Sequence, residues 1–134
     1  MQVAMNCLRV LSNEAEGHRT RGDLRAAVQC LRDALNISLI MHDKRSEARC
    51  RHNLGKFLSD ANMLEEAEVE LRLALRLKGE HLNSDTEWET RRSTLDSLAG
   101  VLSKQLRYGD ALIFRHQALD LVERHDPRSR QHAL

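Results

Sequence analysis

The sequence predicts an all-α protein built as a stack of three helix-turn-helix repeats, with about six helices in total. One observation is a pattern in which an alanine is followed seven residues later by an alanine–leucine pair, starting at Ala27, Ala67 and Ala111. The spacings of 40 and 44 residues are typical of stacked units, none of which can bury its apolar face alone. A second observation is the composition, with 31% charged residues, 3% aromatic residues and one proline. This balance is typical of helices whose outer surfaces are solvated.

The first helix of each repeat is predicted from apolar residues at helical spacing. In the third repeat they lie at i, i+3, i+4 and i+7, which forms one stripe of an amphipathic helix: Leu95, Leu98, Ala99 and Leu102. The earlier repeats show the stripe more weakly, at Leu8, Leu11 and Ala15 and at Leu54, Gly55 and Leu58.

The second helix of each repeat contains the recurring alanines and the leucines beside them. Small residues lie at matched positions of the first helices (Ala15, Gly55, Ala99) and of the second helices (Ala27, Ala67, Ala111). We expect these small residues to let the two helices of a repeat approach closely, while leucines fill the remaining space.

Turn signals separate the predicted helices. Within the repeats they are Gly22-Asp23, Ala61-Asn62 and Leu106-Arg107, and between repeats they are Asp43 to Ser46 and Asn83 to Thr86. Ser84 and Glu87 have the spacing of a capping box, and Pro127 ends the last predicted helix. We therefore expect one repeat domain over residues 1–124, with repeats at about 5–42, 44–82 and 86–124, and a polar tail over 125–134.

The composition excludes several classes of protein. With 21 basic and 20 acidic residues, the chain lacks the basic excess of a nucleic-acid-binding protein. No apolar run approaches the roughly 20 residues of a membrane span. Three cysteines without close pairing indicate a reducing compartment, and hence the cytoplasm, although an organelle lumen reached after removal of a targeting peptide stays open.

No pattern in the chain predicts an enzyme. The seven histidines are scattered, without an HExxH motif or a Cys/His cluster of zinc spacing. Glycine-rich phosphate loops and nucleophile-elbow motifs are also missing. We therefore predict no catalytic residues, no metal site and no cofactor.

The chain resembles tetratricopeptide repeats, specifically the longer variety of kinesin light chains and related scaffolds. The third repeat shows this best, in Thr94 to Ala99, Leu106 to Ala111 and Gln117 to Leu121. Glu80 to Asp85 resembles the extended loop of that family, although it lacks the usual proline. The resemblance extends from about Cys7 to about Glu123, and it implies a right-handed superhelix that binds protein or peptide partners.

Two arginines depart from the family pattern. Arg51 lies where a first helix usually presents an apolar residue, and Arg115 replaces the bulky apolar residue that Leu31 and Leu71 supply in the other repeats. Either stem can run along the core while its head reaches water. The alternative for Arg115 is an acidic group of a partner.

The resemblance also implies that the first helices line a concave groove. The groove residues would be Arg9, Asn13 and Glu16, then Arg49, His52, Asn53 and Lys56, and then Asp96 and Lys104. Asn13 and Asn53 match an asparagine with which family members hold a peptide backbone, and Ser97 replaces it in the third repeat. Because Arg49, His52 and Lys56 lie at helical spacing, we expect a peptide partner with an acidic segment. The alternative for these charges is an ordinary solvated helix face.

A second interpretation makes the chain a structural subunit of a larger complex, docked through its outer face or its ends. Solenoids need polar caps, and the chain shows no obvious capping helix. The last helix is rich in apolar residues, and its predicted interface consists of Phe114, Leu119, Leu121 and Val122. Such a surface indicates further repeats, self-association as a homo-oligomer, or a partner.

Overall fold

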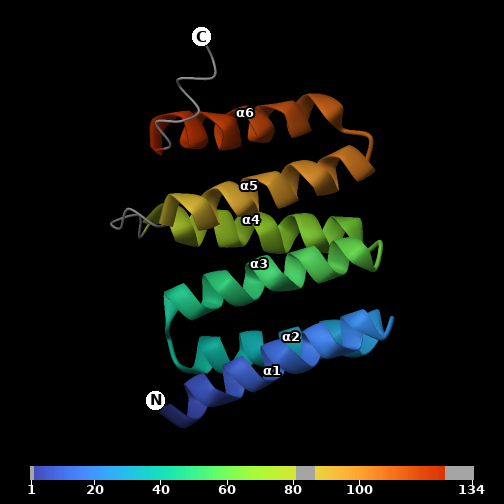
Figure 1. The fold of residues 1–134 in the computed structure, drawn as a ribbon, viewed down its shortest axis with the longest axis vertical. Coiled ribbons are helices and arrows are strands. Elements are labelled where there is room, and N and C mark those ends of the chain that lie inside the picture. Colours follow the sequence, from blue (N-terminus) through green and yellow to red (C-terminus); the bar gives the residue numbers. More distant parts are fainter. Residues whose placement is uncertain (1, 81–86, 126–134) are drawn as a thin grey trace.

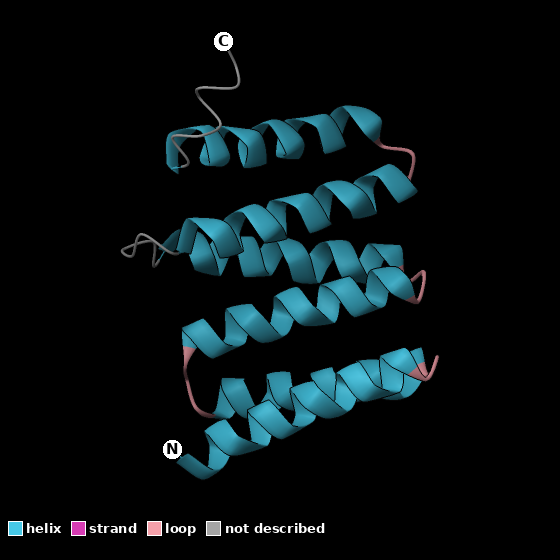
Figure 2. Cartoon of the chain, in the orientation of Figure 1, coloured by secondary structure: helices cyan, strands magenta, loops and turns pink. Residues whose placement is uncertain are grey.

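A computed structural model of the chain describes residues 2–80 and 87–125, and these residues form six helices without a strand (Figure 2). In chain order they are α1 Gln2–Thr20, α2 Leu24–Ile40, α3 Lys44–Asp60, α4 Leu64–Glu80, α5 Glu87–Lys104 and α6 Tyr108–His125. Each helix packs against the next one along the chain. Figure 1 shows the resulting stack, with α1 at one end and α6 at the other. The predicted all-α stack of paired helices is confirmed.

The turns inside the three repeats share one geometry. The first helix of each repeat ends shortly before a residue in the left-handed region, at Gly22 (φ 83°), Asn62 (φ 62°) and Leu106 (φ 62°). In each turn the next N–H donates to the carbonyl five residues back: Asp23 to His18, Met63 to Leu58 and Arg107 to Leu102. These bonds satisfy carbonyls that the end of a helix leaves without partners. The three turns lie where the sequence predicts them.

The connection between α2 and α3 is shorter than predicted. The turn signal covers Asp43 to Ser46, but α3 already begins at Lys44. Asp43 is the N-cap of α3, and its carboxylate accepts bonds from the Arg45 N–H (3.2 Å) and the Ser46 hydroxyl (2.8 Å). Chiefly because of the Ser46 bond, the pKa of Asp43 lies below its ordinary value. Ser46 is therefore a helical residue that supports the cap. The predicted capping box at Ser84 and the stop at Pro127 lie outside the described residues.

The small residues form the close contact between the helices of a repeat. Ala15, Ala27, Ala67, Ala99 and Ala111 are all buried. A Cβ atom added at Gly55 would lie 2.6 Å from Cγ of Leu71 and 3.3 Å from the carbonyl oxygen of Ala67. The middle repeat therefore has no room for a side chain at this point, and a glycine is needed there.

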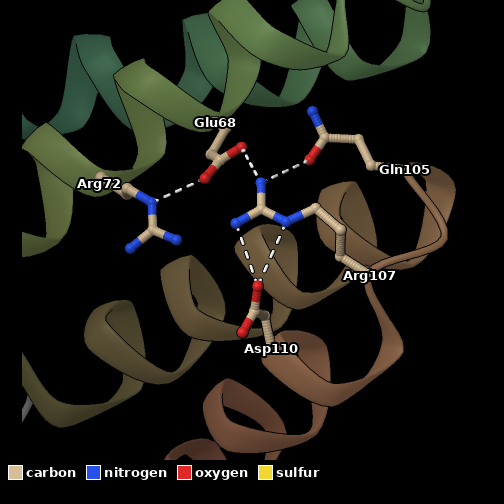
Figure 3. Close-up of polar contacts among 5 residues, drawn as sticks. All are labelled: Glu68, Arg72, Gln105, Arg107 and Asp110. Atoms are coloured by element: carbon tan, nitrogen blue, oxygen red, sulfur yellow. Dashed lines mark hydrogen bonds and ion pairs between the residues drawn. The ribbon is translucent and has the colours of Figure 1, made fainter.

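A polar network ties the second repeat to the third (Figure 3). Arg107, in the turn before α6, donates to Glu68 of α4 at 2.8 Å and to Asp110 at 3.1 Å. Glu68 also accepts from Arg72 at 2.9 Å, and the Gln105 side chain accepts from Arg107 at 3.2 Å. The hydrogen bonds to Asp110 are the main reason that the pKa of Arg107 lies above its ordinary value. The network positions the turn between α5 and α6 against α4.

Candidate functional site

The first helices of the repeats present a common surface, which we call the first-helix face. It consists of the sides of α1, α3 and α5 that bear the predicted groove residues. Arg19 of α1 pairs with Asp60 of α3 at 3.3 Å between Nε and Oδ2. Lys104 of α5 donates to the carbonyl oxygen of Ser59 of α3 at 3.2 Å and to its hydroxyl at 2.9 Å. These contacts join the C-terminal ends of α1 and α5 to the C-terminal end of α3.

Arg49 and Lys56 are the two exposed cations at the centre of the face. Seven residues separate them on α3, so they lie about 10.5 Å apart along one side of the helix. Neither forms an ion pair with another residue in the described parts of the chain. Asn53, which is half-buried, lies between them on the same helix. The face therefore presents two solvated positive charges with an amide between them.

Arg51 of the same helix behaves differently. Its guanidinium pairs with Glu47 at 2.8 Å and with Glu70 of α4 at 3.1 Å, and the Arg51 and Glu70 side chains are only 16% and 13% exposed. The predicted departure from the family pattern is thus an ion pair between α3 and α4, not a head that reaches water. The corresponding positions are apolar in the other repeats: Leu11 and Cys30 in the first, Leu95 and Phe114 in the third.

Three of the predicted groove residues bond to neighbouring residues of the chain. His52 lies 3.0 Å from the hydroxyl of buried Thr94, measured from Nδ1, and thereby links α3 to α5. Glu16 accepts from Arg19 at 2.9 Å. Lys104 is bonded to Ser59, as described above. His52 and Lys104 therefore link α3 to α5, whereas Glu16 bonds within α1.

The remaining predicted groove residues lie on the same three helices. Arg9 and Asn13 of α1 and Asp96 of α5 are exposed, and Asn53 of α3 is half-buried. Asn13 and Asn53 occupy equivalent positions of successive repeats, 40 residues apart. The structure therefore places one amide on each of the first two repeats of the face.

The predicted interface of α6 is only partly solvent-facing. Leu119 is 53% exposed, whereas Leu121 and Val122 are half-buried. Phe114 packs against the main core, and the Arg72 guanidinium lies over its ring at 5.3 Å from the centroid. Phe114 is thus mainly a packing residue between α6 and the rest of the stack.

Sequence reasoning missed three more exposed apolar residues on α6, of which Tyr108 (59%) and Leu112 (57%) share a side with Leu119, whereas Ile113 (55%) does not. Tyr108, Leu112 and Leu119 lie at i, i+4 and i+11, which is one side of a helix. That spacing was the available signal. It was hidden because Arg115 interrupts the stripe at i+7.

The described residues contain neither a cluster of metal-ligand side chains nor a helix that could span a membrane. No group of three or more His, Cys, Asp or Glu side chains is placed to hold a metal ion within residues 2–80 and 87–125. No described helix is long and apolar enough to cross a membrane. Burial raises the pKa of the Cys50 thiol, and that of half-buried Cys30, whereas Cys7 is exposed. Cys50 is therefore a small packing residue of the core, whereas Cys7 lies at the surface.

The fold and the first-helix face define a stack of helical hairpins with an exposed charged surface. A family model described as tetratricopeptide repeat matches residues 48–86, which include most of α3 and all of α4. The match supports a tetratricopeptide repeat protein and suggests a protein–protein interaction module. A search of curated proteins found no significant match.

Proposed function

We propose that the chain is a non-catalytic scaffold or adaptor whose first-helix face binds an extended, acidic peptide segment of a protein partner. The observation that supports this most directly is the pair Arg49 and Lys56, which are exposed and have no ion-pair partner among the described residues. Arg51 of the same helix, by contrast, is paired with the carboxylates of Glu47 and Glu70. A neighbouring acidic residue thus neutralises Arg51, but no described one neutralises Arg49 or Lys56.

The spacing of the two cations favours a stretch of acidic residues over a single carboxylate. An extended peptide advances about 3.4 Å per residue, so about three residues span the 10.5 Å or so between the cations. Asn53 between them offers a donor and an acceptor, which suits a peptide backbone unit. Asn13 would repeat that grip on the first repeat. Exposed Asp96 would limit the acidic segment to the region of the first two repeats.

We also propose that the repeats belong to a particular variety of the tetratricopeptide repeat. The spacings of 40 and 44 residues support the long, kinesin-light-chain-like variety of the repeat. The three free cysteines are compatible with a cytoplasmic location, where thiols stay reduced. A scaffold role without catalysis agrees with the tetratricopeptide repeat family, which is generally non-catalytic.

The test is binding of a fluorescent Glu/Asp-rich peptide at low salt, measured by anisotropy, with a Lys-rich peptide as comparison. Arg49→Glu with Lys56→Glu is expected to weaken binding by about 10- to 100-fold, because two attractions become repulsions. The matched control is Arg25→Glu with Arg76→Glu, the same charge change on exposed cations of α2 and α4, which is expected to change affinity less than about threefold.

Equal weakening in both double variants would reduce the effect to net charge and contradict the proposed site. Absence of acidic-peptide binding by the unaltered chain would also contradict it. Far-UV circular dichroism of each variant establishes that helicity is retained.

A second candidate function is a structural subunit that docks in a larger complex through its outer face and terminal helices. The exposed residues Tyr108, Leu112 and Leu119 of α6 favour this candidate. A partner that is captured equally well by the Arg49→Glu/Lys56→Glu variant but lost on Leu112→Ser with Leu119→Ser would support it over the peptide-binding function.

A further inference from the structure

The two end helices of the described stack each have one uncovered side. Among the described helices, α1 packs along its length only against α2, and α6 only against α5, while single side chains such as Arg19 and Phe114 reach α3 and α4. The internal first helices α3 and α5 are covered from both sides, by a second helix of the preceding repeat and by their own partner. We call the uncovered side of α1 the leading face and the uncovered side of α6 the trailing face.

Comparison with the internal repeats shows which residues form the leading face. Val10 is 48% exposed, whereas its counterpart Cys50 in α3 is buried. Glu14 is exposed, whereas its counterparts Leu54 and Leu98 are buried. The same position is thus leucine where a preceding helix covers it and glutamate where none of the described helices does.

The same comparison defines the trailing face of α6. Leu112 is 57% exposed, whereas Val28 at the matched position of α2 is buried. Arg115 is exposed, whereas Leu31 and Leu71 are buried. An arginine therefore lies at the centre of the stripe formed by Tyr108, Leu112 and Leu119.

Exposure of Ile113 has a different origin. Ile113 and its α4 counterpart Val69 are both exposed, each at 55%. Because α4 is followed by a further repeat and α6 is not followed by a described one, this position lies outside the junction between repeats. Ile113 is therefore not a trailing-face residue.

The α2–α3 junction shows the register in which these two faces would meet. α2 and α3 run antiparallel around a short turn, and Ala34 and Cys50 belong to one buried cluster. One helical turn farther from the connection lie Leu31 on α2 and Leu54 on α3, both buried in the main core. In a continued stack, α6 would take the place of α2 and α1 the place of α3.

In that register the matched residues of the two end faces have opposite charge. Ala118 would lie level with Val10, and Arg115 would lie level with Glu14, where the internal junction has Leu31 and Leu54. One turn farther along, the internal junction has Val28 level with Phe57, and the continued stack would have Leu112 level with Gly17. A larger residue on α6 would thus meet a smaller one on α1.

We propose that copies of this chain associate head to tail, with the trailing face of α6 packed on the leading face of α1 of a second copy. Arg115 of one copy pairs with Glu14 of the next, and Leu112, Leu119 and Val10 pack around this pair. A charged pair that is enclosed by apolar residues favours its own register strongly over others. The contact is heterologous, so each dimer retains one free face of each kind and longer linear oligomers follow as the concentration rises.

The charges argue against the two-fold symmetric alternatives. A dimer formed through two α6 helices would bring the Arg115 side chains of both copies into one apolar interface, and a dimer through two α1 helices would do the same with Glu14. Like charges that face each other are destabilising. The head-to-tail contact is the arrangement in which each charge meets its opposite.

The experiment is sedimentation velocity of the 134-residue chain from about 1 µM to about 500 µM, a range chosen for weak association. The unaltered chain is expected to show a weight-average mass that rises continuously with concentration. Arg115→Glu alone and Glu14→Arg alone are each expected to weaken association at least about tenfold, because each places like charges in every contact. An equimolar mixture of the two variants is expected to associate again, since each contact between unlike variants then pairs opposite charges. The double variant is expected to recover as well.

Matched controls and contrary outcomes keep the test decisive. Arg25→Glu, an equal charge change outside both faces, is expected to leave association unchanged, and circular dichroism checks that every variant is folded. A chain that stays monomeric to about 500 µM overturns the proposal. A discrete dimer that Glu14→Arg does not weaken identifies a two-fold contact through α6 and overturns the proposal too. Because the readout is association without peptide, its failure is separate from failure of the proposed peptide site.

Discussion

At one position of the repeat, the internal junctions have a buried apolar residue, whereas the two end faces have an exposed charged residue. At the internal junctions, Leu31 and Leu54 are buried, whereas at the ends the matched residues Arg115 and Glu14 are exposed. The apolar neighbours do not follow this change, since Leu112 and Val10 remain apolar and exposed. The ends are therefore neither ordinary solvent-facing surfaces nor ordinary junctions. They combine the apolar character of a junction with a single charge on each side.

The interior also shows how a charge is accommodated when it is covered. Arg51 and Glu70 replace an apolar pair inside the middle repeat, and each supplies the other's counter-charge at 3.1 Å. A buried charge is tolerated when its partner is present. In the proposed head-to-tail contact, Arg115 and Glu14 would follow the same rule, because each would be covered together with its counter-charge.

The largest difference between the interior and the ends is expected in the unfolding free energy lost when a leucine is replaced by alanine. Leu71→Ala, in the core beside Gly55, is expected to lower the free energy of unfolding by about 2–5 kcal/mol, because it leaves a cavity. Leu119→Ala on α6 is expected to change it by at most about 0.5 kcal/mol. Urea unfolding at low micromolar protein measures both. Equal losses would show that the two positions are packed alike and would remove the distinction.

A smaller effect is expected when the interior charge loses its partner. Arg51→Leu is expected to cost about 2–3 kcal/mol, because it leaves the carboxylate of Glu70 largely buried without a cation. Adding Glu70→Phe is expected to recover most of that loss, because the third repeat has Leu95 and Phe114 at these two positions. Urea unfolding of both variants is the measurement. Additive losses in the double variant would mean that the apolar pair cannot replace the ion pair in this repeat.

The smallest effect concerns the connection between repeats. Asp43→Ala is expected to cost about 1 kcal/mol through loss of the α3 N-cap, and Asp43→Asn less than that. The pKa of Asp43 is lowered in the folded state, mainly by the Ser46 hydrogen bond. The stability that the ionised Asp43 carboxylate adds to the folded state is therefore fully present above the ordinary pKa of an aspartate. It is lost as the pH falls through the lowered pKa.

Urea unfolding midpoints measured between about pH 6 and about pH 3 test the predicted loss of stability at low pH. The Asp43→Asn variant is expected to lose less stability over that range than the unaltered chain does, because an amide in place of the carboxylate does not titrate. An identical acid dependence of the two proteins would assign the acid sensitivity to other carboxylates.

Much of the fold could be predicted from the sequence because its determinants are local. The spacing of Ala27, Ala67 and Ala111 places the second helices, and the turn signals at Gly22 and Asn62 end two of the first helices. Helix periodicity, capping and left-handed turn residues act within a few residues of one another. The length of the α2–α3 connection was misjudged because Ser46, a residue common in turns, instead donates to the cap.

The candidate site could be predicted only in outline. The charged residues Arg9, Arg49, Lys56 and Asp96 form no ion pair with another described residue, and Asn13 and Asn53 add amides to the same first-helix face, which suits the proposed binding role. His52 and Lys104 are instead bonded to Thr94 and Ser59, which are more than 40 residues away in sequence. A one-dimensional pattern gives the face of a helix on which a residue lies, but not whether a distant residue already occupies its polar atoms.

By itself, the sequence determined the all-α class, the three repeats and the close helix contact at the recurring alanines, because each follows from periodicity along a single helix. Only the tertiary structure decided that Arg51 is a paired interior charge, and that Glu14 and Arg115 lie on faces that no described helix covers. The physical reason is that burial and pairing depend on which helix packs against which. Charged residues that look alike in sequence then differ by whether another helix supplies their partner.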